Sequence, residues 1–217
     1  MSIRLENVHK SYKLHGGSSK AVLRGVNAVF AKGEAVGILG RNGAGKSTLL
    51  RLISGVEYPE AGRIHREMSI SWPLGHAAAM HYSISGADNA RFIARIYEKP
   101  IAETVEFVEG FAELGQYYRQ PVRTYSSGMM TRLGLALSLA VDFDCYLLDE
   151  VVAAGDSRFA ERCRAALLDR RARSTMLMVS HQAETVRAFC TSGAVLKDGR
   201  LTRYEDLDQA IAAYHAG

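Results

Sequence analysis

The chain has few cysteines, and no two of them lie close together in the sequence. Its three cysteines, Cys145, Cys163 and Cys190, are widely spaced among 217 residues, and no CxxC motif occurs. An odd number at wide spacing argues against a disulfide framework or a zinc site and favours a reducing compartment. The N-terminus, MSIRLENVHK, also lacks the apolar stretch of a secretory signal. We therefore expect a protein of the cytoplasm.

A segment suited to crossing a membrane is missing as well. Residues 68–87 carry no formal charge and match a bilayer span in length, but they contain Pro73, Gly75, Gly86, four serines and two histidines. A proline near the start would break a membrane helix, and unsatisfied polar groups are costly in lipid. We predict no transmembrane helix, so this uncharged segment needs another explanation.

A strong charge imbalance is absent too. The chain has 27 Lys and Arg against 23 Asp and Glu, a formal net charge of +4, and 47% hydrophobic residues. This composition argues against disorder and, at this length, fits one α/β domain with a smaller subdomain. The mildly basic balance is compatible with a nucleotide, an anionic membrane surface or nucleic acid, and it does not choose among them.

Hydrophobic patterns predict strands that alternate with helices. Predicted strands cover residues 3–9, 22–31, 35–39, 145–150 and 175–181. Predicted helices cover residues 49–54, 87–119, 126–140 and 160–173, and a strand pair and a helix close the chain over 194–215. This alternation predicts an α/β fold with a mainly parallel sheet and flanking helices. Residues 76–142 are interpreted as a helical insertion in that fold.

The first motif with a chemical meaning follows the predicted strand 35–39. Residues 40–47, GRNGAGKS, match the phosphate-loop pattern G-x-x-x-x-G-K-[ST]. Glycines let backbone N–H groups curl around phosphates, Lys46 would reach the β- and γ-phosphates, and Ser47 would bind Mg²⁺. The alternative, a glycine-rich turn with an incidental lysine, leaves the flanking strand and helix unexplained. The predicted nucleotide contacts are Gly40, Arg41, Asn42, Gly43, Ala44, Gly45, Lys46, Ser47 and Thr48.

Titratable residues end two later predicted strands. Asp149 and Glu150 follow one apolar run, and His181 follows another. Asp149 would hold Mg²⁺ through water, and Glu150 would polarise an attacking water. The alternatives are a surface carboxylate pair and an ordinary histidine. The position favours a functional role, because ligands of open α/β sheets bind at the carboxyl ends of parallel strands.

A second phosphate-type site is predicted within residues 124–132, TYSSGMMTR. Ser126 suits a helix N-cap and Gly128 a tight first turn, and capping alone is the simpler alternative. A helix N-terminus also attracts anions. Since the phosphate loop already supplies one such site, we expect this one to hold the γ-phosphate of a nucleotide bound to another copy.

The order of these motifs resembles the nucleotide-binding subunit of ATP-binding cassette (ABC) transporters. The phosphate loop, SSGM, LLDE, GD and SH occur in that order and cover nearly the whole chain. The resemblance implies a P-loop NTPase with an antiparallel β subdomain and a helical subdomain, residues 1–217 forming one nucleotide-binding domain, with ATP and Mg²⁺ as cofactors. YSSGM departs from the family signature LSGGQ at three positions and keeps Ser126 and Gly128.

Further site residues follow from the same resemblance. Tyr12 would stack on adenine, with a strand-edge tyrosine as the alternative. Asp156 matches the aspartate of the loop that crosses the dimer interface, and His181 matches the switch histidine that contacts the γ-phosphate.

The family also carries a loop whose glutamine touches Mg²⁺ and the transport subunit. The first glutamine of this chain is Gln116, so that glutamine is missing. We expect the loop within residues 70–81, with His76, His81 or a water replacing the glutamine. The uncharged run around it would contact a membrane partner, with ordinary packing as the alternative.

Finer features resemble the ATPases of polysaccharide exporters. They are SWPLG, the S-G-x-[DN]-N-x-x-F pattern that begins at Ser85, YSSGM, and DEVVAAGD. The resemblance implies a homodimer in the ATP-bound state, peripheral on the cytoplasmic face of the bacterial inner membrane. It would drive a separate integral membrane subunit that exports capsular polysaccharide. O-antigen, teichoic acid or another lipid-linked substrate is the alternative. The stretch after His181 is too short for the carbohydrate-binding domain of some O-antigen exporters.

Two other classes lack their expected motifs. A soluble P-loop kinase or GTPase would need an acceptor site or a base-reading NKxD motif, and we find neither. A cassette that acts on DNA or ribosomes would usually carry paired cassettes or a long coiled-coil insertion, so no nucleic-acid partner is expected. The six arginines between residues 158 and 173 suit a solvated helix face, with contact to anionic lipid or polymer as the alternative.

Overall fold

The computed structural model describes residues 1–13, 17–74, 80–149 and 157–216. The chain divides into two compact units. The core unit comprises residues 1–73, 143–150 and 168–217, and the helical unit comprises residues 74–142 and 151–167. The helical unit therefore contains the range of the predicted insertion and also a later segment that the sequence pattern did not assign to it. That both units form a single nucleotide-binding domain stays a prediction.

A six-stranded sheet forms the centre of the core unit. Its strands, in spatial order, are β5 (Ile70–Leu74), β6 (Cys145–Asp149), β7 (Thr175–Ser180), β3 (Ala35–Leu39), β8 (Ser192–Lys197) and β9 (Arg200–Tyr204). β6, β7, β3 and β8 run parallel, and β9 pairs antiparallel with β8. Every residue of β3, β6 and β7 is buried. This confirms the strands predicted from continuous apolar runs.

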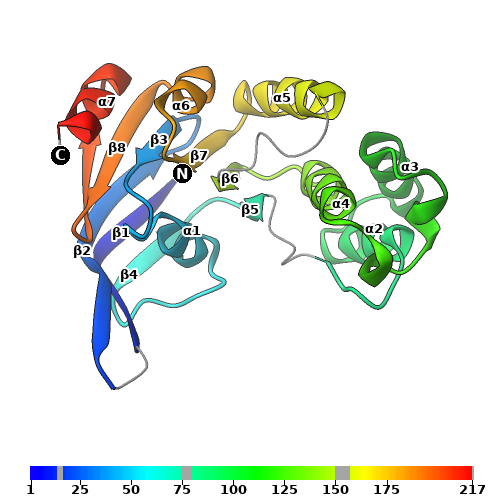
Figure 1. Cartoon of the computed structure of the whole chain (residues 1–217), viewed down its shortest axis with the longest axis horizontal. Helices are drawn as coiled ribbons and strands as arrows, with labels where there is room; N and C mark the ends of the chain where they lie inside the picture. Colours follow the sequence, from blue (N-terminus) through cyan, green and yellow to red (C-terminus); the bar gives the residue numbers. More distant parts are fainter. Residues whose placement is uncertain (14–16, 75–79, 150–156, 217) are drawn as a thin grey trace. The chain divides into compact units, whose positions relative to one another are not determined.

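Three helices of the core unit lie against this sheet (Figure 1). They are α1 (Lys46–Ser54), α6 (Ala183–Phe189) and α7 (Leu207–His215). α6 and α7 approach closely because glycines of the sheet face them. A Cβ atom on Gly37 of β3 would clash with Val186 of α6, and one on Gly193 of β8 would clash with Ala210 of α7. A larger side chain at either glycine would push its helix away from the sheet.

A three-stranded antiparallel sheet completes the core unit. Its strands, in spatial order, are β2 (Ser19–Ala31), β1 (Ser2–Lys13) and β4 (Ala61–Arg66). Apolar residues on its inner face, such as Ile3 and Leu23, join the same hydrophobic core as β3 and β7. The backbone N–H of Arg24 also donates to the carbonyl oxygen of Gly199, at 2.8 Å, in the turn between β8 and β9. The antiparallel β subdomain is therefore confirmed.

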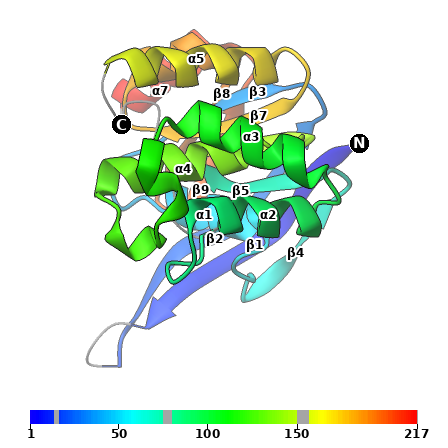
Figure 2. The ribbon, with the colours of Figure 1, turned by 90° about the vertical axis from the view of Figure 1, so that its right-hand side faces the viewer.

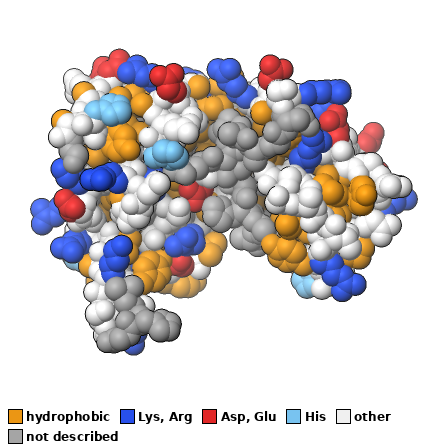
Figure 3. Space-filling view, in the orientation of Figure 1, with side chains coloured by type: hydrophobic (Ala, Val, Ile, Leu, Met, Phe, Trp, Pro, Cys, Tyr) orange, Lys and Arg blue, Asp and Glu red, His pale blue; other side chains and the backbone are white. Residues whose placement is uncertain are grey.

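The described part of the helical unit contains four α-helices or parts of them. They are α2 (Gly86–Ile96), α3 (Ile101–Ala112), α4 (Ser127–Leu139) and the first part of α5 (Ser157–Arg171). α3 packs against both α2 and α4 (Figure 2). Hydrophobic side chains reach the surface of this unit on the face that Figure 3 shows. Phe92, Ile96 and Phe107 are among the exposed hydrophobic residues of the unit.

The prediction of one helical stretch over residues 87–119 is wrong in two places. Glu98 has a positive φ of 52°, and Pro100 stands immediately before α3, so residues 97–100 do not continue the helix. After Ala112, the chain forms 3₁₀ turns at η2 (Gly115–Arg119) and η3 (Val122–Thr124) instead of an α-helix. The helix predicted over 126–140 with Ser126 as its N-cap is confirmed by α4.

Residues 70–74, the first part of the range in which the loop was expected, form strand β5, and residues 75–79 lie outside the described residues, so the position of that loop stays a prediction. Pro73 is compatible with this strand because β5 lies at the end of the sheet, where a missing N–H breaks no ladder. The short elements β4 and α6 were not predicted. Among the described helices, none combines the length and the hydropathy needed to span a membrane.

Candidate nucleotide-binding site

The phosphate loop lies between the end of β3 and the start of α1. Gly43 and Gly45 have positive φ angles of 80° and 105°, a conformation that side chains with a Cβ disfavour. Neighbouring atoms also leave no room for a side chain at Gly45 and Gly40. A Cβ on Gly45 would lie 2.5 Å from Cγ1 of Val22, and one on Gly40 would lie 2.7 Å from the carbonyl oxygen of Leu196. The backbone conformation therefore favours glycine at Gly43, the lack of space requires it at Gly40, and both apply at Gly45.

Lys46 folds back across this loop. Its Nζ donates to the carbonyl oxygens of Gly40 at 2.7 Å and Arg41 at 3.3 Å, and the residue is only 7% exposed. A cation held beside the N-terminus of α1 adds to the positive end of the helix dipole. Ser47 and Thr48 follow in the first turn of α1. The loop therefore has the fold and charge needed to hold phosphate groups.

Tyr12 takes part in a network that the sequence analysis missed. Its hydroxyl donates to Oε2 of Glu57 at 2.6 Å, and Nη2 of Arg51 donates to the Tyr12 oxygen at 3.3 Å. Nε of Arg51 also donates to Oε1 of Glu57 at 2.6 Å, and Lys10 lies 3.4 Å from the same carboxylate. Burial works to raise the pKa of Glu57, but hydrogen bonds from Tyr12 and Arg51 outweigh it and hold that pKa below its ordinary value. The network attaches the end of β1 to α1.

The titratable residues predicted to be functional follow neighbouring strands. Asp149 ends β6 and pairs with Val179 of β7, while Leu39 of β3 pairs with Ser180, the residue before His181. The sheet therefore brings Asp149, Gly40 and His181 to the same edge, as the sequence predicted. Asp149 is buried and His181 is exposed. Glu150 and Asp156 lie outside the described residues.

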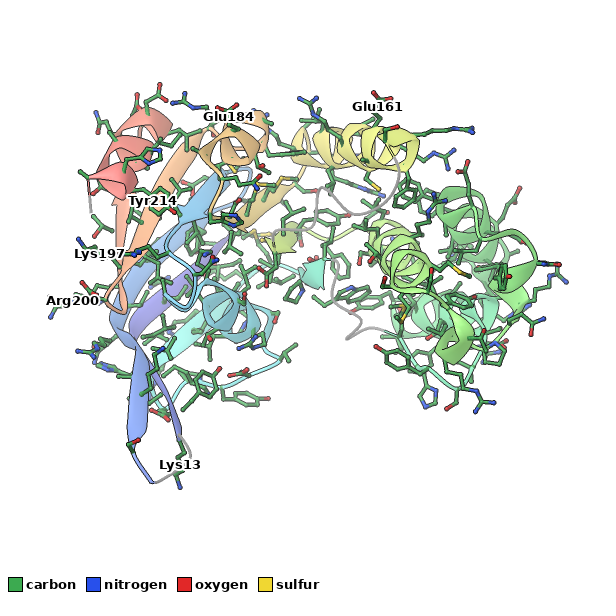
Figure 4. The ribbon with its side chains drawn as sticks, viewed as in Figure 1. Lys13, Glu161, Glu184, Lys197, Arg200 and Tyr214 are labelled. Carbon is green, nitrogen blue, oxygen red and sulfur yellow. The ribbon has the colours of Figure 1, made fainter. Side chains whose placement is uncertain are left out.

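A cavity of about 600 Å³ adjoins the phosphate loop. It is lined by Gly40–Ala44, by β2 around Val22, by the turn after Lys197 and by Tyr214 of α7. Lys197 and Tyr214 are seen on this side of the core unit in Figure 4. The cavity gives the loop an open approach.

Ser126 is the N-cap of α4 in the helical unit. Its Oγ accepts a hydrogen bond from the backbone N–H of Met129 at 3.3 Å. Ser126, Ser127 and Gly128 are all exposed, whereas Tyr125 is buried and donates from its hydroxyl to the carbonyl oxygen of Tyr117 at 2.7 Å. The first turn of α4 is thus presented at the surface on a fixed support.

His81 is tied to α2 through its backbone. Its N–H donates to Oδ1 of the fully buried Asn89 at 2.7 Å, and Nδ2 of Asn89 donates to the His81 carbonyl oxygen at 3.1 Å. The side chain of His81 is exposed and accepts from the backbone N–H of Ser83 at 3.4 Å. His76, the other candidate for the missing glutamine, lies outside the described residues.

Comparisons with known proteins agree with this geometry. A family model described as ABC transporter matches residues 23–153. The chain is 49% identical to the ATP-binding protein BexA of Haemophilus influenzae, over 98% of both chains. It is 50% identical to the capsule polysaccharide export ATP-binding protein CtrD of Neisseria meningitidis serogroup B, over 99% of both. It is 44% identical to the polysialic acid transport ATP-binding protein KpsT of Escherichia coli, over 98% of this chain and 96% of that protein.

A solved structure supports the fold. The dimeric structure of an ATP-binding cassette in a post-hydrolysis state, bound to ADP and Pi, matches with a TM-score of 0.80 at 24% identity, covering 94% of this chain and 98% of that one. The parallel sheet and its phosphate loop define the class as a P-loop nucleoside triphosphatase. Within that class, the chain belongs to the ABC transporter family and is one of its ATP-binding, ATP-hydrolysing subunits.

Proposed function

We propose that this chain powers the export of a capsular polysaccharide across the bacterial inner membrane. The observation that carries the proposal is the phosphate loop with Lys46 folded across it, in a chain about half identical, over its full length, to a capsule polysaccharide export ATP-binding protein. The loop supports nucleotide binding, and the similarity to a capsule polysaccharide export protein supports the substrate class.

The core unit binds the nucleotide in this proposal. Backbone N–H groups of residues 40–48 surround the phosphates, and Lys46 contacts the β- and γ-phosphates. Tyr12 stacks on adenine. Ser47 and Asp149 hold Mg²⁺, which neutralises phosphate charge when bound. Among the described residues, no three His, Cys, Asp or Glu side chains cluster as a protein-only metal site requires. Ser47, with Asp149 acting through a water, would be enough here, because Mg²⁺ usually keeps substrate phosphates and waters as its other ligands.

Hydrolysis depends on Glu150 and His181. Glu150 accepts a proton from the attacking water and orients it, and His181 contacts the γ-phosphate. We expect Glu150→Gln to bind ATP normally but to lose roughly 10²–10⁴-fold in turnover, because a positioned base contributes about that much. Steady-state phosphate release measures the turnover. A Glu150→Gln variant that hydrolyses ATP near the wild-type rate would remove Glu150 from this role.

A second copy completes the site. Ser126 and Gly128 lie at an exposed helix N-terminus, where N–H groups and the dipole favour an anion, and we propose that they contact the γ-phosphate bound to the other copy. Asp156 crosses the interface between the copies. The proposed assembly is a homodimer that forms with ATP and separates after hydrolysis.

In this proposal, the formation and separation of the dimer drive a separate membrane subunit. We propose that the chain docks on it at the cytoplasmic face of the inner membrane, through the uncharged segment of residues 68–87, which contains both Trp72 and His76. Trp72→Ala and His76→Ala test this contact. Both variants should weaken copurification with the membrane subunit, and unchanged copurification and unchanged coupled hydrolysis would contradict the assignment.

The decisive experiment uses the source cell. The chain is deleted and restored as wild type or as Glu150→Gln, and surface and intracellular polysaccharide are compared. Polymer retained inside the cell and rescued only by wild type is the expected result. Unchanged surface polymer would reject the polysaccharide as substrate and leave a different exported molecule to be identified.

A further inference from the structure

Four charged side chains meet at the end of α3, and the roles proposed above do not use them. Oε1 of Glu113 lies 2.5 Å from Nη2 of Arg162 and 3.9 Å from Nη2 of Arg158, and its Oε2 lies 3.9 Å from Nη1 of Arg132. Arg132 belongs to α4, and Arg158 and Arg162 belong to α5. All four residues lie in the helical unit. We call them the Glu113 cluster.

Glu113 ends α3 in a way that is locally unfavourable. It is the C-cap residue and has φ 49° and ψ 46°, the left-handed conformation in which glycine or asparagine is usual. A carboxylate at a helix C-terminus also opposes the helix dipole, and the last turn of α3 contains no basic residue to offset it. A non-glycine residue keeps a left-handed conformation when surrounding groups stabilise it. The partners of the Glu113 carboxylate therefore lie outside α3.

Arg162 supplies the compensating charge from α5. Its Nη1 donates to the carbonyl oxygens of Gly110 at 3.1 Å and Phe111 at 3.2 Å, while its Nη2 donates to Glu113. These carbonyls belong to the last turn of α3, where intrahelical donors run out. One guanidinium therefore fixes the start of α5 to the end of α3.

Phe159 extends the cluster to α4. The guanidinium carbon of Arg132 lies 4.7 Å from the centroid of the Phe159 ring, and Phe111 meets that ring edge to face at 5.8 Å. Phe159 is 1% exposed. The acidic residue of the same turn of α5, Glu161, is exposed on the outer side of the helix (Figure 4). Cation–π and aromatic contacts thus join α4 to α5 beneath the ion pairs.

Stability does not account for all of these charges. Ion pairs between partly exposed side chains contribute little to folding, and the side chain of Arg158 is 82% exposed while that of Glu113 is 35% exposed. The helices that the Glu113 cluster joins say more about its role. Arg132 lies in the second turn of α4, the helix that Ser126 caps, and α5 begins immediately after Asp156.

We propose that Glu113 is a positioning residue for ATP hydrolysis. Through Arg162 and Arg132 it holds the helix capped by Ser126 and the helix after Asp156 in one arrangement, so that both reach the nucleotide of the other copy together. The inference rests on the proposed two-copy site. Glu113 therefore affects turnover, whereas the affinity of a single chain for ATP depends on the phosphate loop of the core unit.

The first test compares Glu113→Gln with Glu103→Gln in the full chain. Glu103 is an exposed carboxylate on α3 with no ion pair among the described residues. We expect Glu113→Gln to lower kcat by about 5- to 20-fold, the scale on which misplaced groups and coupled pairs act. The Kd for ATP of the isolated chain and the melting temperature should remain close to wild type. An unchanged kcat in a folded Glu113→Gln variant rejects the positioning role.

A second variant separates positioning from helix capping. Glu113→Gly removes the carboxylate but relieves the left-handed backbone conformation. We expect it to be as stable as wild type or more stable and still to show the loss of kcat. Recovery of wild-type kcat in Glu113→Gly would show that only the helix cap matters, and would overturn the proposal.

A double-mutant cycle identifies the partner. Arg162→Gln should lower kcat like Glu113→Gln, and the double variant should lose no more than the larger single loss, because both changes break one contact. Arg164→Gln, an exposed arginine on α5, is the matched control and should change nothing. Losses that multiply in the double variant contradict the coupling. Wild-type hydrolysis that Lys46→Ala abolishes supports ATP hydrolysis at the phosphate loop independently of the two-copy arrangement, so a negative result at Glu113 rejects this inference and leaves that function standing.

Discussion

At the scale of single residues, Asp144 links separate segments of the core unit through its side chain. Its Oδ1 lies 2.8 Å from Nζ of Lys32, and its Oδ2 accepts from the backbone N–H and the hydroxyl of Ser69 at 3.0 and 2.8 Å. The hydrogen bond from Lys32, followed by those from Ser69, lowers the pKa of Asp144 to about 2. The carboxylate therefore connects three segments that are distant in sequence.

We expect Asp144→Asn to alter how stability depends on pH. The folded pKa of Asp144 lies below the unfolded value of about 3.9, so the carboxylate stabilises the fold above about pH 4, and this contribution is lost as pH falls from about 4 towards 2. The variant should be less stable at pH 7 and should lose less stability on acidification. Urea unfolding at pH 7 and pH 3 measures both, and parallel losses in the two proteins would contradict the assignment.

Lys46→Ala tests a residue at the phosphate loop. Hydrogen bonds to charged groups are worth about 1.5–3 kcal/mol, so we expect ATP affinity to fall by about 10- to 150-fold. Lys197→Ala is the control, because Lys197 lines the adjoining cavity but is not part of the loop. Equal losses in the two variants would show that the cavity as a whole, and not the loop lysine, holds the phosphates.

At the scale of elements, two glycines that look alike in the sequence have opposite roles. Gly62 of β4 has a φ of 86°, and a Cβ there would clash with the carbonyl oxygens of Glu6 and Asn7 of β1. Gly110 lies inside α3, and a Cβ there would meet nothing within 4 Å. The first glycine permits close strand pairing, and the second only adds flexibility to a helix.

This contrast predicts effects of opposite sign. Gly110→Ala should stabilise the chain by about 0.5–1 kcal/mol, because alanine restricts the unfolded backbone and favours helix. Gly62→Ala should destabilise it by about 1–3 kcal/mol through strain and overlap. Free energies of unfolding from denaturant titration measure both changes. Destabilisation by Gly110→Ala would mean that the exposed face of α3 tolerates no added methyl group.

At the scale of the whole molecule, the three cysteines can be used to follow the unfolding of both units. Cys145, Cys163 and Cys190 are all buried, Cys163 in the helical unit and the other two in the core unit. Burial raises the pKa of Cys163 to about 11 and that of Cys190 to about 12, and it also raises that of Cys145. Buried, protonated thiols react slowly.

Thiol labelling can therefore show whether the two units unfold together. We expect no rapid labelling of the native chain by an aromatic disulfide reagent at pH 8, and labelling of all three cysteines in denaturant. If the units unfold as one, Cys163 and Cys190 should become reactive at the same denaturant concentration. Earlier exposure of Cys163 would show that the helical unit opens by itself.

Patterns of neighbouring residues in the sequence were sufficient to predict several strands, the phosphate loop and a helix N-cap. Continuous apolar runs predicted β3, β6 and β7 because strands buried on both faces leave no polar position. The phosphate loop was predictable because its glycines, lysine and serine are contiguous and their spacing follows from phosphate chemistry. Ser126 was predictable as an N-cap because capping is a contact between near neighbours in sequence.

Tertiary structure decided whatever depends on residues distant in sequence. Pro73 argued against a helix, but only the fold shows that it lies in a strand, which tolerates it because β5 is at the end of the sheet. Tyr12 meets Glu57 and Arg51 only because the fold brings the end of β1 within hydrogen-bond distance of α1 and the turn that follows it. Glu113 gave no sequence signal, since its partners come from α4 and α5. Such contacts leave no regular spacing in the sequence. They form only when separate helices and strands pack together and bring their side chains within reach.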